Sequence, residues 1–134
     1  MRTKFFSLAV LLSALTLSAV VFAQTAPVCV VGKSGVAPTA TLTFTAPTKN
    51  TDGTPVATPL TYELFQGTAS GQETLVATDL TGSPISVTTG LADGETLYWF
   101  IKVMDAHGTT SAPSNEVCKT FPAAVPSSVT ITIS

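Results

Sequence analysis

The stretch LYWFIKVM at residues 97–104 decides the fold class of this chain. Its side chains fall into two alternating sets, Leu97, Trp99, Ile101 and Val103 in one and Tyr98, Phe100, Lys102 and Met104 in the other. A period of two places successive side chains on opposite faces of a β-strand. Because both sets are largely apolar, the run predicts a strand near the centre of a sheet.

Further strand-like runs lie on both sides of this stretch. Residues 40–46 alternate apolar residues with threonine, which is typical of a strand with one buried face. Other strands are expected at residues 61–66, 73–79, 85–89 and 116–121. Loops rich in Gly, Pro, Asn and Asp separate them, at residues 47–59 and 106–115 among others. The pattern predicts an all-β protein, a seven-stranded antiparallel β-sandwich.

Length and charge narrow the possible functions. The 134 residues suit one compact domain. Beyond residue 23 the chain holds four Lys, no Arg and eight acidic residues. Nucleic-acid binding depends on clustered Lys and Arg, so we expect no nucleic-acid partner.

The first 23 residues have the layout of a secretory signal peptide. Two basic residues precede a mostly apolar run from Phe5 to Val21, and small or tolerated residues end it at Ala23. The alternative is an uncleaved membrane anchor, since the run is at the lower limit for spanning a bilayer. We expect cleavage after Ala23, no membrane insertion afterwards, and a secreted, periplasmic or cell-envelope location.

Two cysteines, Cys29 and Cys118, lie near the two ends of the expected domain. An exported chain meets an oxidising environment, so one disulfide is predicted, with two unpaired buried thiols as the alternative. A zinc or redox site is not expected, because there is no Cys-x-x-Cys pair and only one histidine.

Several motifs resemble those of the fibronectin type III family. They are LTFTAPT at 42–48, TDGTP at 51–55, YELF at 62–65, GLADG at 90–94 followed by the strand 97–104, and SAPSNEV at 111–117. The resemblance covers about residues 38–120 and implies that family's sandwich, with the loops around 50–55 and 105–115 at one end. A leucine, Leu97, stands where the family usually has a tyrosine. The expected organisation is a signal peptide at 1–23, the domain at 24–121, and a tail at 122–134.

No catalytic residue, metal site or cofactor is predicted. His107 is the only imidazole, and it lies in an expected turn without a nucleophile motif nearby. The acidic residues are scattered along strands and turns rather than paired for glycoside hydrolysis. Asp52 and His107, which lie in the two loops, are instead expected to contact a ligand or partner. The fold also serves spacers, adhesins and binding modules, so the resemblance alone assigns no function.

Two surface features are candidates for binding. Phe65, Tyr98 and Phe100 are expected on the outer face of one sheet, where exposed aromatics stack on sugars or contact proteins; the simpler interpretation is ordinary cross-strand pairing. The tail has alternating apolar residues, Val129, Ile131 and Ile133, which predict an extra strand. That strand either folds back on the domain or adds to another chain.

The sequence therefore predicts a non-enzymatic, exported interaction module with a protein partner or with itself as partner. The first alternative is a carbohydrate-binding or adhesive module that uses the aromatic face. The second is a subunit of an extracellular polymer or phage particle, which uses the tail as its assembly strand.

Overall fold

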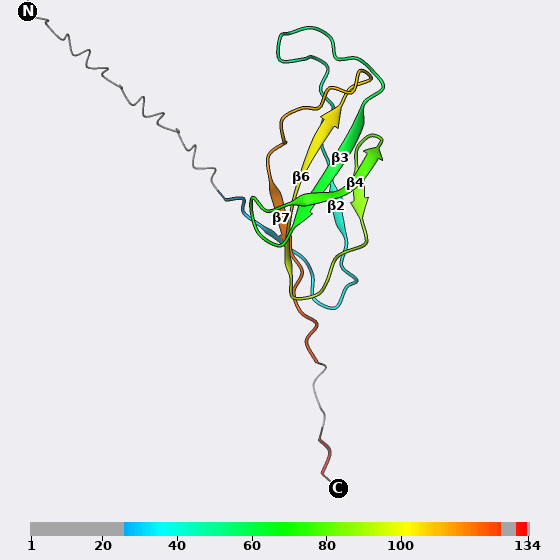
Figure 1. Ribbon diagram of the computed structural model, residues 1–134. Coiled ribbons are helices and arrows are strands. Elements are labelled where there is room, and N and C mark those ends of the chain that lie inside the picture. The colour runs from blue at the N-terminus through cyan, green and yellow to red at the C-terminus, as the bar shows by residue number, and fades with distance from the viewer. Residues whose placement is uncertain (1–25, 127–130, 134) are drawn as a thin grey trace, which may run out of the picture.

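The computed structural model describes residues 26–126 and 131–133, and within these residues the chain forms strands and no helix (Figure 1). The expected signal peptide and the tail residue Val129 lie outside the described residues. The seven strands are β1 (Val30–Val31), β2 (Ala40–Leu42), β3 (Thr61–Gly67), β4 (Thr74–Leu80), β5 (Ile85–Val87), β6 (Thr96–Met104) and β7 (Val117–Thr120). The predicted all-β sandwich of seven strands is confirmed.

The strands form two sheets of unequal size. One has the order β1-β7-β6-β3-β4, and the other consists of β2 and β5 alone. All pairs are antiparallel except one: β1 runs parallel to β7, with Val30 opposite Lys119. The sequence analysis expected only antiparallel pairs and did not identify β1, which at two residues is too short for a periodic pattern.

Some predicted strands are longer than the real ones. The run at 40–46 is a strand only over Ala40–Leu42, because the Phe44 backbone N–H donates instead to the hydroxyl Oγ of Ser83 at 2.9 Å. The run at 85–89 pairs only over Ile85–Val87. The second sheet is therefore a short ribbon.

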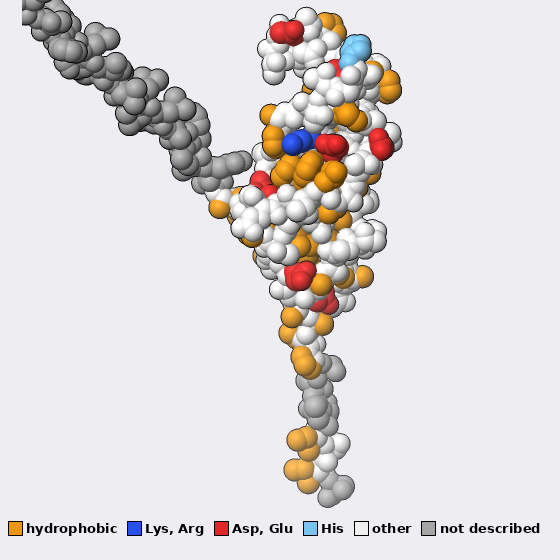
Figure 2. Space-filling model, in the orientation of Figure 1, with side chains coloured by type: hydrophobic (Ala, Val, Ile, Leu, Met, Phe, Trp, Pro, Cys, Tyr) orange, Lys and Arg blue, Asp and Glu red, His pale blue; other side chains and the backbone are white. Residues whose placement is uncertain are grey.

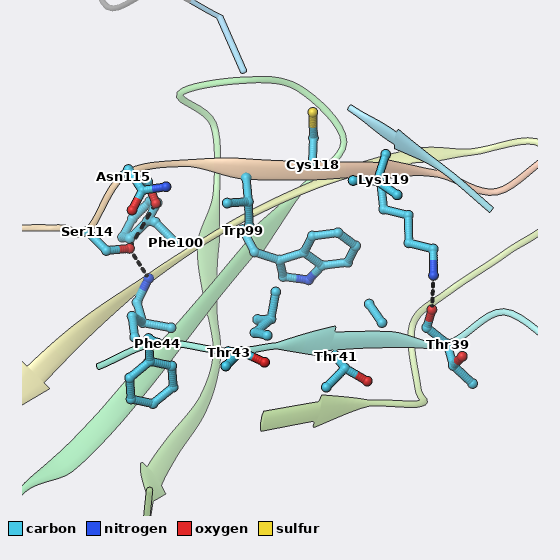
Figure 3. A pocket seen from close by; sticks show the side chains of 15 residues that line it. Thr39, Thr41, Thr43, Phe44, Trp99, Phe100, Ser114, Asn115, Cys118 and Lys119 are labelled. Atoms are coloured by element: carbon cyan, nitrogen blue, oxygen red, sulfur yellow. Dashed lines mark hydrogen bonds between the residues drawn. The ribbon is translucent and has the colours of Figure 1, made fainter. Parts of the chain in front are cut away.

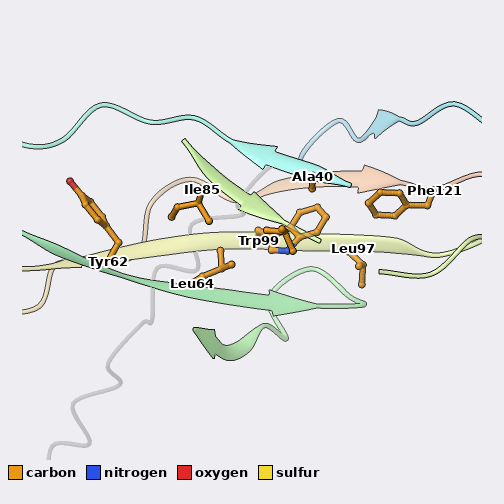
Figure 4. Packing of buried hydrophobic residues seen from close by; sticks show 8 residues of the cluster. Ala40, Tyr62, Leu64, Ile85, Leu97, Trp99 and Phe121 are labelled. Atoms are coloured by element: carbon orange, nitrogen blue, oxygen red, sulfur yellow. The ribbon is translucent and has the colours of Figure 1, made fainter. Parts of the chain in front are cut away.

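The core lies between the two sheets (Figure 4). Leu97 and Trp99 of β6 are buried, as the alternation predicted, and pack with Ala40 and Ile85 of the small sheet. The Trp99 indole meets the ring of Phe121 edge to face, with centroids 6.5 Å apart. Its N–H donates to Oε1 of Gln66 at 2.8 Å, so this buried polar group is satisfied.

A disulfide joins Cys29 to Cys118, as predicted, across 89 positions of sequence. Cys29 directly precedes β1, and Cys118 lies in β7. The bond holds the N-terminal segment beside β7, where Gly32 N–H also donates to the Thr120 carbonyl at 2.8 Å. The first strand of the domain is thereby attached to the large sheet and not to β2.

Replacing both cysteines by serine should lower the free energy of unfolding by about 2–5 kcal/mol, because the bond closes a long loop in the unfolded chain. Chemical denaturation of the two proteins measures the difference. Chemically reduced wild type is the control and should behave like the variant. Equal midpoints with and without the bond would contradict this account.

Candidate interaction surfaces

The two loops that carry Asp52 and His107 lie together at one end of the sandwich, as the resemblance implied. The Ala106 backbone N–H donates to the Ala57 carbonyl at 3.2 Å and joins them. A histidine and acidic side chains are visible at this end in Figure 2. The two loops therefore form one continuous surface. Their carboxylates, however, accept hydrogen bonds from groups of the same loop.

Both loop carboxylates stabilise their own turns. The Asp52 Oδ1 accepts hydrogen bonds from the hydroxyl and backbone N–H of Thr54, at 2.6 and 3.0 Å, and these bonds lower the pKa of Asp52. The Asp105 Oδ1 accepts from the backbone N–H groups of Thr109 and His107, at 2.8 and 2.9 Å, and the pKa of Asp105 is likewise lowered. His107 itself is 78% exposed, with Nδ1 3.8 Å from Asp105 Oδ2. Asx-type turns of this kind account for both acids without a ligand.

Phe65 and Phe100 lie directly opposite each other on β3 and β6, on the outer face of the large sheet, as predicted. Their rings stack with centroids 4.6 Å apart and planes inclined by 16°. The ammonium Nζ of Lys102 lies 5.1 Å from the Phe65 ring centroid. Each ring is half-buried, so the pair is a cross-strand contact as well as part of the surface.

Tyr98 faces the same side but lies farther along β6. It is opposite Gly67 of β3 and Cys118 of β7, so it is beside the disulfide. Its neighbour Leu97 is 2% exposed and fills the core position that the resemblance would assign to a tyrosine. The three predicted aromatics therefore share a face, with Tyr98 separated from the stacked pair.

Replacing Phe100 by Ser should lower the free energy of unfolding by about 1–2 kcal/mol, the size of a lost half-buried aromatic contact, and leave the domain folded. Thermal unfolding followed by circular dichroism measures the loss. Phe65→Ser is the matched variant and should cost a similar amount. Complete unfolding of either variant would show that these rings belong to the core.

A groove opens between the two sheets where the edge of β2 faces β7. Its volume is about 510 Å³. Trp99 lies between the two strands at its floor (Figure 3). The remaining apolar residues that line it come from both sheets: Val30, Ala40, Leu42, Phe44, Phe100, Ile101, Val117 and Cys118.

Polar groups bound the groove at its ends. At one end the Lys119 ammonium donates to the Thr39 carbonyl at 2.6 Å and bridges the sheets (Figure 3). At the other end lie Ser114 and Asn115. The Ser114 hydroxyl accepts from the Ile101 backbone N–H at 3.1 Å. The result is an apolar channel with a polar rim, a form suited to an extended apolar segment.

One side of this groove is an unpaired strand edge. Among the described residues β2 pairs with β5 alone, so its other edge has no ladder partner. The sequence analysis missed the groove, because it placed no strand near residue 30. The signal was present in the predicted Cys29–Cys118 bond, which places residue 30 next to the strand that holds Cys118.

Two of the three predicted tail residues are described. Ile131 and Ile133 form no strand and are 83% and 95% exposed. The described part of the tail thus contacts no apolar surface that would bury these side chains. The predicted strand at 128–134 stays a prediction.

Two carboxylates that the sequence analysis read as scattered lie close together. The Gly71 backbone N–H donates to Glu73 Oε1 at 3.4 Å and to Glu116 Oε2 at 3.1 Å. The other Glu116 oxygen, Oε1, is buried without a hydrogen-bond partner. Desolvation, with a smaller contribution from Glu116, raises the pKa of Glu73 above its ordinary value of 4.5. Within the described residues no group of three His, Cys, Asp or Glu side chains could hold a metal ion.

A raised carboxyl pKa means that the folded protein binds the proton more tightly than the unfolded chain. Stability is therefore greatest below the ordinary pKa and falls as the pH rises through the folded-state value. Glu73→Gln should be more stable than wild type at pH 7, and the difference should vanish below about pH 4. Denaturation midpoints of the two proteins, measured between about pH 4 and pH 7, show whether the variant is the more stable at neutral pH. A difference in stability of the same size at pH 7 and below pH 4 would contradict this account.

No protein-family model and no curated protein matches this chain. Among solved structures it is similar to an Fn3-like protein from Clostridium thermocellum, with 27% identity and a TM-score of 0.49. The alignment covers 73% of this chain and 96% of that one. The fold assignment itself rests on the strand order and core described above. A sandwich of this kind does not identify a particular family member.

Within the part of the chain that the structure describes, no helix has the length and apolar character needed to cross a membrane. The disulfide is of the kind found in proteins outside the cytoplasm.

Proposed function

We propose that this protein is a non-catalytic, exported interaction module that binds an extended protein segment in the groove between β2 and β7. The observation that carries the proposal is the unpaired β2 edge beside an apolar channel of about 510 Å³. An added strand gains main-chain hydrogen bonds from such an edge, and alternate side chains enter the channel. The groove offers both an unpaired strand edge and a channel for side chains.

The other parts of the proposal rest on separate observations. The Cys29–Cys118 bond supports export, because such bonds persist in oxidising compartments. A non-catalytic role is supported by the state of His107, since its ring is exposed and its Nδ1 lies 3.8 Å from the Asp105 carboxylate, beyond hydrogen-bond distance. A catalytic imidazole needs an orienting acid and a nucleophile within hydrogen-bond reach.

The aromatic face supports the carbohydrate alternative less well. Phe65 and Phe100 each give one ring face to the other, and the Lys102 ammonium lies near the Phe65 ring. Sugar-binding platforms need ring faces that are free to stack on the sugar. We therefore place the binding site in the groove.

The proposal is tested with an uncharged peptide of alternating threonine and valine, added to isotope-labelled protein. Amide chemical shifts should change along Ala40–Leu42 and at Val117, because these residues border the groove. A peptide of the same composition, with its threonines and valines in two blocks, controls for non-specific apolar binding and should cause smaller changes.

Val117→Arg should abolish the shifts, since it places a charge at the mouth of an apolar channel. Leu75→Arg is the matched control: Leu75 is 48% exposed and Val117 39%, and Leu75 lies on β4, outside the groove. Shifts centred on Phe65 and Lys102, which lie together outside the groove, or equal effects of the two arginines, would place the binding surface elsewhere.

A further inference from the structure

We infer that the segment bound in the groove is the C-terminal tail, residues 128–134, of a second copy of this chain. The inference rests on the proposed function and names the partner of the same site. The acceptor is the β2 edge with its channel, and the donor is the alternating sequence SVTITIS. Each molecule would thus add the strand that the small sheet of its neighbour lacks.

The acceptor needs a strand because of where the disulfide places β1. The small sheet has only two strands, β2 and β5, since β1 is attached to β7 by the bond and by parallel pairing. The large sheet protects its own edges better. There β1 has only two residues, and β4 is irregular, with register shifts against β3 and a positive φ of 56° at Asp79. Short and bulged edge strands resist pairing with another chain.

The donor matches the groove in length and pattern. At roughly 3.3 Å per residue, the five positions from Val129 to Ile133 span about 13 Å, and Thr39 to Phe44, which lines the groove, spans about 17 Å. In a strand, Val129, Ile131 and Ile133 project to one face, and Thr130 and Thr132 project to the other. The apolar face would meet Trp99, Leu42 and Val117, and the threonine face would meet water.

The chemistry of the tail agrees with this placement. The chain holds no Asp, Glu, Lys or Arg after Lys119, so no charged side chain would be desolvated when the tail enters the channel. Ile131 and Ile133 are 83% and 95% exposed, and Val30, which lines the groove, is 65% exposed. Pairing would remove all three from water.

The path of the chain after β7 favours another molecule's groove over its own. β7 runs along the groove from the Asn115 end to the Lys119 end, so the chain would have to reverse direction to reach its own β2 edge. Phe121 is fixed at that point, with its N–H on the Glu95 carbonyl at 2.8 Å and its ring in the core. Residues 122–126 contain no turn or bend, and Pro122 and Pro126 favour an extended backbone. A tail that continues outward reaches a neighbour without reversal.

A smaller pocket of about 240 Å³ lies at the opposite opening of the sandwich, between β5 and β4. It is lined by Ile85, Val87 and Leu80 among others and has less than half the volume. Three bulky aliphatic side chains fit the larger channel better. We therefore assign the tail to the β2 side.

The test is sedimentation velocity of the exported, disulfide-intact chain over a range of concentrations. Wild type should form oligomers whose mass rises with concentration, because donor and acceptor are different surfaces. The tail variant Ile131→Asp/Ile133→Asp should weaken association on the order of 100-fold, since two buried aliphatic side chains are replaced by charges. Thr130→Asp/Thr132→Asp adds the same charge to the water-facing side and should associate nearly as well as wild type.

A mixing experiment identifies the donor and the acceptor. The tail variant keeps an intact groove, and Val117→Arg keeps an intact tail, so each alone should be monomeric. Mixed in equal amounts, the two should form one-to-one dimers. Dimers confirm the exchange; two monomers in the mixture overturn it.

Other outcomes separate this inference from the proposed function. If wild type is monomeric while the alternating peptide still shifts the groove amides, the groove binds strands but the tail of a second copy is the wrong occupant. If wild type is monomeric and the tail variant alone shows changed amides at Ala40–Leu42, the tail covers its own groove and the inference is overturned. If neither peptide nor tail affects the groove, both the inference and the proposed function fail.

Discussion

The bond between Cys29 and Cys118 determines how the strands are shared between the two sheets. It fixes the N-terminal segment beside β7, and the short parallel pair of β1 and β7 follows from that position. Because β1 pairs with β7 in the large sheet, it cannot also pair with β2, and β2 is left with β5 as its one partner. The five-to-two division of strands, the open edge and the channel beside it all depend on this one covalent constraint.

The channel exists because one side of the sandwich lacks a covering strand. Two packed sheets normally exclude water by side chains that interdigitate across a gap of about 10 Å. Here Trp99 and Phe121 fill the centre, but no strand covers the opening beside β2, where apolar residues such as Leu42 and Val117 line the groove. The Lys119 side chain crosses the opening at one point, and its Nζ lies 5.3 Å from the Phe121 ring centroid. A single long side chain therefore connects the two sheets at one end of an edge that has no strand beside it.

Much of the fold could be predicted from the sequence, because period-two alternation directly reports which residues face the core. This held for Leu97 and Trp99 in β6, and for the outward pair Phe65 and Phe100. It failed at residues 30 and 31, since two residues are too few to show a period. It also failed to show where a strand ends: the alternation continues through Thr43 and Phe44, but a hydrogen bond to Ser83 interrupts the ladder there.

The candidate site was less accessible to the same reasoning. A groove between sheets is formed by residues from both, and no local pattern reports which opening of a sandwich lacks a strand. The contact between Glu73 and Glu116 is another long-range result, because both carboxylates meet at the Gly71 N–H across 43 positions of sequence. Asp52 and His107, by contrast, were correctly placed in neighbouring loops, but their side chains bond within those loops.

The hydrogen bond from the Trp99 indole to Gln66 links parts of the molecule that are distant in sequence. The Gln66 amide nitrogen in turn donates to the Gly90 carbonyl at 3.1 Å, so two hydrogen bonds connect β6, β3 and the segment after β5. The indole proton exchanges with solvent only when its hydrogen bond to Gln66 opens. Since the protein has a single tryptophan, that one proton provides an isolated resonance whose exchange rate reports how often the contact between Trp99 and Gln66 opens.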